Sequence, residues 1–458
     1  MLRKLDEYLN IVSEQIRYTK IRGTVAEELK NNSLDQAEAY EACGAFPEEA
    51  LERAVREIGD PVETGVALDR IHRPQMNWGI VIAIGIISIL SIGIFYAANI
   101  LAHDIFPWQR QALFVLIGFL LMLLVYHLDY SILGKLGWKP AFTFLLFMIL
   151  GWLFFSQEVY GVKRWIHISF FSISISEAML LYVPLFGAAL YSFRGNGYGA
   201  LLKILPLILL PVYFVFITPD ISSAMILFIC LFCMFIFAVW KNWFQIPKKP
   251  VSFISSGIVI LTPVAYVGYF YIFGAEYQAA RIQAFFSPSE YVRYGGYIAH
   301  LAQEMRESST LFGGSDVALK SFLTGPTTDF LTDYVLISMC SIYGIFLTVA
   351  IIMGLLFIIA KIFRISMAQK NQLGMIVGVG CGLVLFIKTA IGILINLQLL
   401  PYVSISMPFL SYGGSGTIVS YILLGLVLSI YRYKNILPKE SLQKPKRHLR
   451  LKLERETR

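Results

Sequence analysis

The chain has 458 residues, of which 57% are hydrophobic and 15% are charged, and its mean hydropathy is +0.66. Soluble proteins carry about 25% charged residues, so this composition excludes a soluble globular protein and indicates one embedded in a membrane. The net charge of +8 is unevenly distributed, because residues 1–73 hold 10 Lys/Arg against 15 Asp/Glu. The rest of the chain is therefore strongly basic, which in a membrane protein is first a signal of topology.

Residues 1–73 are predicted to form a small helical domain. Apolar residues recur there at helical spacing, as in Leu2, Leu5, Leu9, Val12 and Ile16. Pro47 suits the first turn of a later helix, and Gly59-Asp60-Pro61 marks the end of that helix and the start of the next. The stretch EEALERAVREIGDP resembles the HAAS-type helical domain at the N-termini of some Bacillota membrane proteins. The simplest explanation of this domain is a solvated helical adaptor without a catalytic role.

Ten apolar segments follow, each close to the length of about 20 residues that crosses a bilayer as a helix. They lie near 78–101, 110–128, 140–156, 175–193, 200–218, 221–240, 251–273, 334–362, 373–396 and 412–431. The sequence therefore predicts an all-α polytopic protein with about ten transmembrane helices. Its membrane domain would span 74–435, between the helical domain and a basic tail at 436–458.

Alternate connections between these segments carry the basic residues, namely Lys135 and Lys139, then Arg194, then Lys241, Lys248 and Lys249, then Lys361, Arg364 and Lys370, then Arg432 and Lys434. The positive-inside rule places these connections, and both termini, in the cytoplasm. The connection 274–333 then faces outward as a large extracytoplasmic loop. The basic tail is expected to contact the anionic inner leaflet, in preference to nucleic acid.

The outer loop of about 60 residues is too long for a simple connector, and loops of that length are usually functional or disordered. It closes with Asp329 and Asp333 just before an apolar segment. Four residues apart, these acids would share one face of a helix. One explanation is that they stabilise the N-terminus of the following helix. The other is that one of them is a catalytic base.

Four further ionisable residues lie near or within apolar segments, where charges are costly and therefore candidates for function. Lys163 and Arg164 stand on the predicted outer side, against the positive-inside bias, which either phosphate binding or an interfacial anchor explains. Asp220 follows a tight Thr-Pro turn, where it is either a helix N-cap or part of a site. Lys388 either pairs with an acid such as Glu177 or snorkels to an interface.

These places occur together in one family, the SEDS proteins FtsW, RodA and SpoVE, which this chain resembles over about residues 78–435. The matching motifs are GVKRWI (161–166), SISE (174–177), TPDISS (218–223), RIQAFFSP (281–288), Gly296-Tyr297 and MPFLSYGGS (407–415), with Asn396 and Pro401 upstream of the last. The resemblance implies a peptidoglycan glycosyltransferase in a bacterial plasma membrane. Its substrate would be lipid II and its partner a class B penicillin-binding protein.

The catalytic aspartate of the family lies at the end of the large loop, and two frames compete for it here. The residues next to Asp329, in Thr328-Asp329-Phe330, match the family's HTDF segment better. The spacing favours Asp333, because the glycine that the family has eleven residues after its aspartate then falls on Gly344. The resemblance favours Asp333, with Asp329 as the alternative. It also implies substrate-binding roles at matching or nearby charged and hydroxyl positions, namely Lys163, Arg164, Glu177, Asp220, Arg281, Lys388, Ser411 and Tyr412.

Joining two lipid-linked sugars with inversion needs one carboxylate base, and the pyrophosphate leaving group needs stabilisation by arginine, lysine or a divalent cation such as Mg²⁺ or Mn²⁺. The motifs specify no metal ligands. Several family positions differ. The lysine that often follows the glutamate by three residues is Leu180, and the paired glutamates that follow the catalytic aspartate of the family fall on Ser341 and Ile342. These departures leave an inactive scaffold for the penicillin-binding protein as one alternative. Charges near or within the apolar segments, at Asp220 and Lys388, leave a flippase for a lipid-linked precursor as the other.

Overall fold

The computed structural model describes residues 2–101, 108–158, 162–168, 171–273, 283, 285–286, 297–317, 320 and 327–434. These residues are mostly helical, and the sheet among them has two strands. The chain divides into two compact units, one containing the helices before Met76 and the other running from Asn77 to Ile430. The predicted all-α polytopic class is confirmed.

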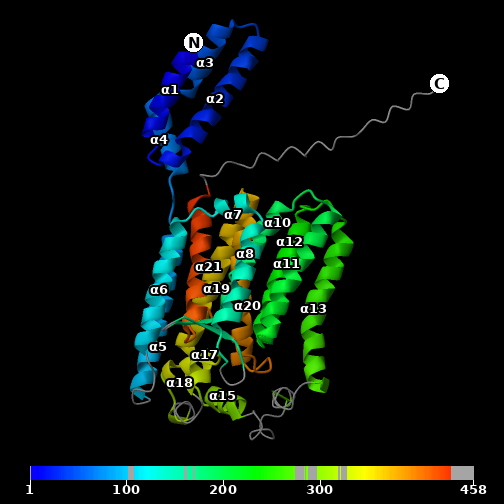
Figure 1. The fold of residues 1–458 in the computed structure, drawn as a ribbon. Coiled ribbons are helices and arrows are strands. Elements are labelled where there is room, and N and C mark those ends of the chain that lie inside the picture. Colours follow the sequence, from blue (N-terminus) through cyan, green and yellow to red (C-terminus); the bar gives the residue numbers. More distant parts are fainter. Residues whose placement is uncertain are drawn as a thin grey trace, which may run out of the picture. The chain divides into compact units, whose positions relative to one another are not determined.

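The N-terminal unit contains four helices, α1 (Leu2–Gln15), α2 (Thr19–Ala42), α3 (Pro47–Ile58) and α4 (Pro61–His72) (Figure 1). Its core is built from the periodic apolar residues of α1 and from α3, including Leu5, Leu9, Val12, Ala50 and Ala54. Pro47 opens α3 as predicted, and Asp60 caps α4 by accepting hydrogen bonds from two backbone N–H groups. Buried Asp69 accepts hydrogen bonds from the Arg17 backbone N–H at 2.9 Å and from the Arg73 guanidinium at 2.8 Å.

The second unit contains the membrane helices. Eight candidate spans within the described residues are long and apolar enough to cross a membrane. They are α5 (Trp78–Leu101), α6 (Trp108–His127), the pair α9 (Ile175–Met179) and α10 (Tyr182–Ser192), α11 (Tyr198–Ile217), α12 (Ile221–Trp240), α19 (Ile345–Met367), α20 (Gln372–Asn396) and α21 (Gly414–Arg432). The remaining predicted segments correspond to the shorter apolar helix α8 (Lys139–Phe155) and to α13 (Lys248–Phe273).

The predicted segment 334–362 is broken in two, into α18 (Val335–Tyr343) and α19. The break falls at Gly344, whose φ of 90° is unfavourable for other residues. The backbone of 310–313 pairs with the chain on both sides of the break, with Thr310 O accepting from Ile345 N at 2.9 Å. A Cβ on Gly344 would lie 2.8 Å from backbone atoms of that segment. The sequence could not show this close approach.

Helix α20 lies at the centre of the unit, where it packs against α10, α12 and α19 and is buried along most of its length. At one end of the unit Figure 1 shows α15 (Tyr297–Glu307), α17 (Thr327–Thr332) and α18, whereas α7 (Ser131–Leu136) lies at the opposite end. Strands β1 (Trp165–Ile168) and β2 (Phe171–Ser174) form an antiparallel hairpin that leads into α9. Residues far apart in sequence therefore meet at the end that contains α17 and α18.

Candidate active site

Asp333 lies between α17 and α18 and is only 4% exposed. The phenol of Tyr402 donates a hydrogen bond to its Oδ2 at 2.7 Å, and the hydroxyl of Ser404 reaches Oδ1 at 3.4 Å. The Tyr402 ring stacks on Tyr334, with 5.6 Å between ring centroids and 13° between ring planes. A buried carboxylate needs such partners, because an ionised group without them is strongly disfavoured.

The side chain of Asn396, at the end of α20, fixes the backbone around Asp333. Its amide nitrogen donates to the Asp333 carbonyl at 2.9 Å. Its amide oxygen accepts from the N–H groups of Leu336 and Ile337, each at 3.1 Å. Asn396 therefore satisfies two of the N–H groups that the first turn of α18 leaves open, and it ties the aspartate to the central helix.

The SYGGS turn holds the preceding residues from another side. Ser411 donates a hydrogen bond to the Thr332 carbonyl and accepts one from the Met407 N–H at 2.6 Å. The Tyr412 N–H donates to the Leu331 carbonyl at 2.9 Å. Both predicted residues thus contact the backbone next to Asp333, and a contact with substrate stays a prediction.

Buried Gln111 of α6 supports the same turn. Its amide nitrogen donates to the Ser411 carbonyl and its amide oxygen accepts from the Gly413 N–H, both at 3.3 Å. Ser91 of α5 donates to the Leu410 carbonyl at 3.2 Å. Phe409, two residues before the SYGGS turn, has a φ of 65°, a conformation that non-glycine residues rarely adopt. Contacts from two membrane helices therefore hold an unusual backbone geometry in place.

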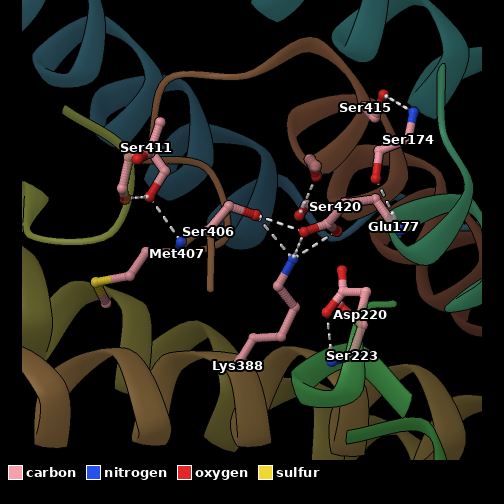
Figure 2. Close-up of polar contacts among 12 residues, drawn as sticks. Ser174, Glu177, Asp220, Ser223, Lys388, Ser406, Met407, Ser411, Ser415 and Ser420 are labelled. Atoms are coloured by element: carbon pink, nitrogen blue, oxygen red, sulfur yellow. Dashed lines mark hydrogen bonds and ion pairs between the residues drawn. The ribbon is translucent and has the colours of Figure 1, made fainter. Parts of the chain in front are cut away.

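A second charged centre joins α9 to α20 (Figure 2). Lys388 donates to the two carboxylate oxygens of Glu177 at 2.8 and 2.6 Å, and the side chains are 3% and 17% exposed. The hydroxyl of Ser406 donates to Glu177 at 2.7 Å and accepts from Lys388 at 3.0 Å. Of the two alternatives for Lys388, pairing with Glu177 is therefore confirmed.

The start of the last span also contacts the helix that carries Glu177. Ser415 accepts a hydrogen bond from the Ser174 N–H at 2.9 Å (Figure 2). Ser174 in turn is the N-cap of α9 and accepts from the Glu177 N–H at 3.5 Å. The SYGGS segment therefore contacts the neighbours of both charged centres, the backbone just before Asp333 through its first residues and the N-cap of α9 through its last.

Arg164 and Lys163 precede the β-hairpin and differ in their surroundings. The Arg164 guanidinium donates through Nη2 to the Pro219 carbonyl, which ties the hairpin to the turn between α11 and α12. Its Nε is buried and has no hydrogen-bond partner within the described part of the chain. The Lys163 side chain is exposed. Arg164 thus has a structural contact, and its binding of a ligand stays a prediction.

Asp220 caps α12, as one of its two predicted explanations requires. Its carboxylate accepts from the Ser223 N–H at 3.1 Å and from the Ser223 hydroxyl at 3.0 Å. The cap alone accounts for an aspartate here. Because α12 packs against both α9 and α20, this carboxylate lies on a helix that adjoins the Glu177–Lys388 centre (Figure 2).

Two predicted site residues lie outside what the structure describes. Arg281 is not among the described residues, and Asp329 is described only as a member of α17, without its side chain. In the described part of the chain, no three His, Cys, Asp or Glu residues gather closely enough to hold a metal ion.

The sequence model of the cell cycle protein family FtsW/RodA/SpoVE matches residues 73–436. The chain belongs to this family. A peptidoglycan glycosyltransferase MrdB of Helicobacter pylori is 26% identical over 71% of this chain and 84% of that protein. A probable peptidoglycan glycosyltransferase FtsW of Trichlorobacter lovleyi is 24% identical over 77% of this chain and 93% of its own.

Solved structures agree with this membership at the level of the fold. The rod shape determining protein RodA of Thermus thermophilus has a TM-score of 0.54 and 19% identity, covering 78% of this chain and 97% of its own. A chain from a peptidoglycan synthase complex has a TM-score of 0.62 and 20% identity, covering 78% of this chain and 99% of its own. The FtsW/RodA/SpoVE fold of the membrane unit is therefore supported by sequence and by structure.

The structure shows how one departure of this family member from the expected motif is compensated. The lysine expected three residues after Glu177 is Leu180, which is buried at 1% exposure. The cation that pairs with Glu177 comes from Lys388 of α20. The charge of Glu177 is thus balanced from a different helix.

Sequence reasoning missed the hydroxyl residues that contact both charged centres, namely Tyr402, Ser404 and Ser406. They alternate along the segment between α20 and α21, to which the sequence analysis assigned no function. Alternation with a period of two was the available signal, because it places side chains on one face of an extended chain. It also missed Gln111, since a single polar residue near the start of an apolar segment is not distinctive.

Proposed function

We propose that this family member polymerises lipid II into glycan strands at the outer face of the membrane, with Asp333 as the general base. The names of the relatives support this reaction. The observation that carries the choice of base is the buried Asp333 carboxylate, which two hydroxyl groups contact and whose backbone Asn396 fixes. A base must be held in a defined orientation to accept a proton from a bound substrate.

In this reaction the 4-hydroxyl of one lipid-linked disaccharide attacks the anomeric carbon of another. The new bond joins the hydroxyl oxygen to the anomeric carbon, and the bond from that carbon to the pyrophosphate oxygen breaks. Asp333 accepts the proton of the hydroxyl as the bond forms, and undecaprenyl pyrophosphate leaves as an anion. This leaving group needs no proton, so one carboxylate suffices.

The pyrophosphate needs positive charge near it as it leaves. Lys163 is exposed, and the neighbouring Arg164 is partly exposed. We assign these two side chains, with Arg281 of the outer loop, to the pyrophosphate. Glu177 and Lys388 form an ion pair, and Asp220 caps α12, which packs against the helices that carry them. We assign all three residues to the substrate-binding region.

A class B penicillin-binding protein is the proposed partner, because one structural relative was solved as part of a peptidoglycan synthase complex. The proposed location is the plasma membrane of a bacterium. The positions of the basic connections support an outward loop at 274–333 and cytoplasmic termini. Lipid tails would then lie among the spans while the reacting sugars are at the outer interface.

The test is lipid II polymerisation by the purified chain together with its class B penicillin-binding protein. Asp333→Asn should lower strand formation by about 100-fold or more, the usual range for losing a general base. Asp329→Asn is the matched control, four residues away, and should stay close to wild type. Loss in Asp329→Asn alone would move the base to that residue.

A folded and partnered wild type that forms no strands would refute the glycosyltransferase proposal. Transport of fluorescent lipid II across proteoliposomes would then identify a flippase. Binding of the penicillin-binding protein without transport would identify a scaffold, the function that the departures at Leu180, Ser341 and Ile342 would favour.

A further inference from the structure

The segment 401–407 between α20 and the SYGGS turn has no helical or strand assignment. Two kinds of side chain alternate along it. Ile405 and Met407 are buried and apolar, whereas Tyr402, Ser404 and Ser406, at every second position, carry hydroxyl groups. In an extended chain, alternate residues face one side. The segment therefore has an apolar side that packs into the protein and a hydroxyl side.

The hydroxyl side contacts one charged centre at each end of the segment. Tyr402 and Ser404, at one end, contact Asp333. Ser406, at the other end, bonds to both members of the Glu177–Lys388 pair. The two centres are thus connected by one short stretch of backbone that is held at both ends.

Of the two contacts to Asp333, that from Tyr402 is the stronger. Its length of 2.7 Å is typical of a hydroxyl bound to a carboxylate, whereas the Ser404 contact is 3.4 Å. The Tyr402 ring is held by stacking on Tyr334, so the position of its hydroxyl is defined by packing. A hydrogen bond from such a preorganised donor orients the carboxylate at no further cost when substrate binds.

We propose that Tyr402 is a positioning residue of the glycosyl transfer, whose phenol holds the Asp333 carboxylate in its reactive orientation while Ser406 anchors the same segment to the Glu177–Lys388 pair. This inference rests on the proposed function, because it assigns Tyr402 a role toward the proposed base. Tyr402 acts through Asp333 and forms no bond with the reacting atoms.

The decisive variant is Tyr402→Phe, which keeps the stacked ring and removes only the hydroxyl. We expect kcat for lipid II polymerisation to fall about tenfold or more, the usual effect of losing one hydrogen bond to a charged group. The KM for lipid II should stay within about twofold, because the interaction orients the base and does not bind substrate. Tyr343→Phe is the matched control, since its phenol donates to the Gly93 carbonyl at the similar length of 2.8 Å.

A second readout needs no activity. In wild type and in Tyr402→Phe, Asp333 is labelled with a carbodiimide and an amine, and the labelled peptide is quantified by mass spectrometry. The variant should label several-fold faster, because the phenol no longer holds Oδ2, and Tyr343→Phe should label like wild type. Unchanged kcat, or a change confined to KM, would overturn the inference, as would equal labelling rates.

The activity and labelling measurements distinguish failure of the positioning role of Tyr402 from failure of the proposed glycosyltransferase function. Active wild type with an active Tyr402→Phe refutes the positioning role and leaves the glycosyltransferase intact. A wild type that makes no strands refutes the glycosyltransferase, and the labelling ratio then decides alone whether Tyr402 holds the carboxylate.

Discussion

Replacing Lys388 with methionine would leave the Glu177 carboxylate inside the protein without its cation. Ser406 is the hydrogen-bond donor that remains at 2.7 Å, and the glutamate side chain is only 17% exposed. Removing one partner of a buried ion pair usually costs about 3–5 kcal/mol. We expect a value of about 3 kcal/mol for Lys388→Met, because some water reaches the glutamate. Glu177→Gln should cost about as much or more, since Lys388 is 3% exposed.

The double variant separates the ion pair from the packing of the two side chains. With neither charge present, no group is left buried and uncompensated, so the double variant should be no less stable than either single variant. The interaction energy in the double-mutant cycle should then be about 3 kcal/mol or more. The free energy of unfolding can be measured for all four proteins by SDS titration in mixed micelles, with tryptophan fluorescence as the signal.

Additive single effects would refute this reasoning. A double variant destabilised by the sum of both single changes would mean that Glu177 and Lys388 stabilise the protein independently. Lys388→Arg provides a control for charge, because it keeps the cation but changes its geometry and volume, and it should fall between wild type and Lys388→Met.

Two further variants test the fold outside the charged centres. Burial raises the pKa of Asp69, but hydrogen bonds from Arg17 and Arg73 outweigh it, so the net pKa lies below its ordinary value. This stabilisation is present above the unfolded pKa of about 4 and is lost as the pH falls through the lower folded pKa. In wild type, the hydrogen-exchange protection factors of α1 and α4, which are corrected for the intrinsic exchange rate at each pH, should therefore fall on acidification. Asp69→Asn should have lower protection factors at neutral pH and should lack this acid-dependent decrease. Gly344→Ala should lower the thermal unfolding midpoint strongly, because of its φ of 90° and the backbone contact described above. Gly354→Ala is its control, with a Cβ contact of 3.6 Å, and should be neutral or stabilising; equal midpoints for the two would contradict the proposed strain.

The sequence predicted the positions of the membrane helices well because the relevant signal is local. A run of about 20 apolar residues can satisfy its backbone in lipid only as a helix. The break at Gly344 was missed because glycine is tolerated in membrane helices, and the feature that requires it is the backbone of 310–313 on another part of the chain. A local pattern carries no information about such a neighbour.

The difference between local patterns and contacts with distant parts of the chain also explains which site residues could be predicted from the sequence. The Glu177–Lys388 pair could be predicted because a buried lysine needs an acid, and few acids lie in apolar surroundings. Asp220 could not be assigned, because a cap and a site use the same residue type at the same position. Tyr402 could not be found by either argument, since its importance comes from the single carboxylate that its hydroxyl contacts.

The contacts of the 401–407 segment help to decide whether the family motif lost at Leu180 means that the site is inactive. If Leu180 meant only that a charged site had been lost, Glu177 would be left buried without a cation. Instead, Lys388 supplies the cation from α20, and Ser406 bonds to both groups from the segment that also carries Tyr402. A charge pair that is costly to bury and is nonetheless kept complete favours a site under functional constraint over an inactive remnant. On this argument, strand formation should be sensitive to Ser406 and Lys388 although neither is proposed to touch the reacting atoms.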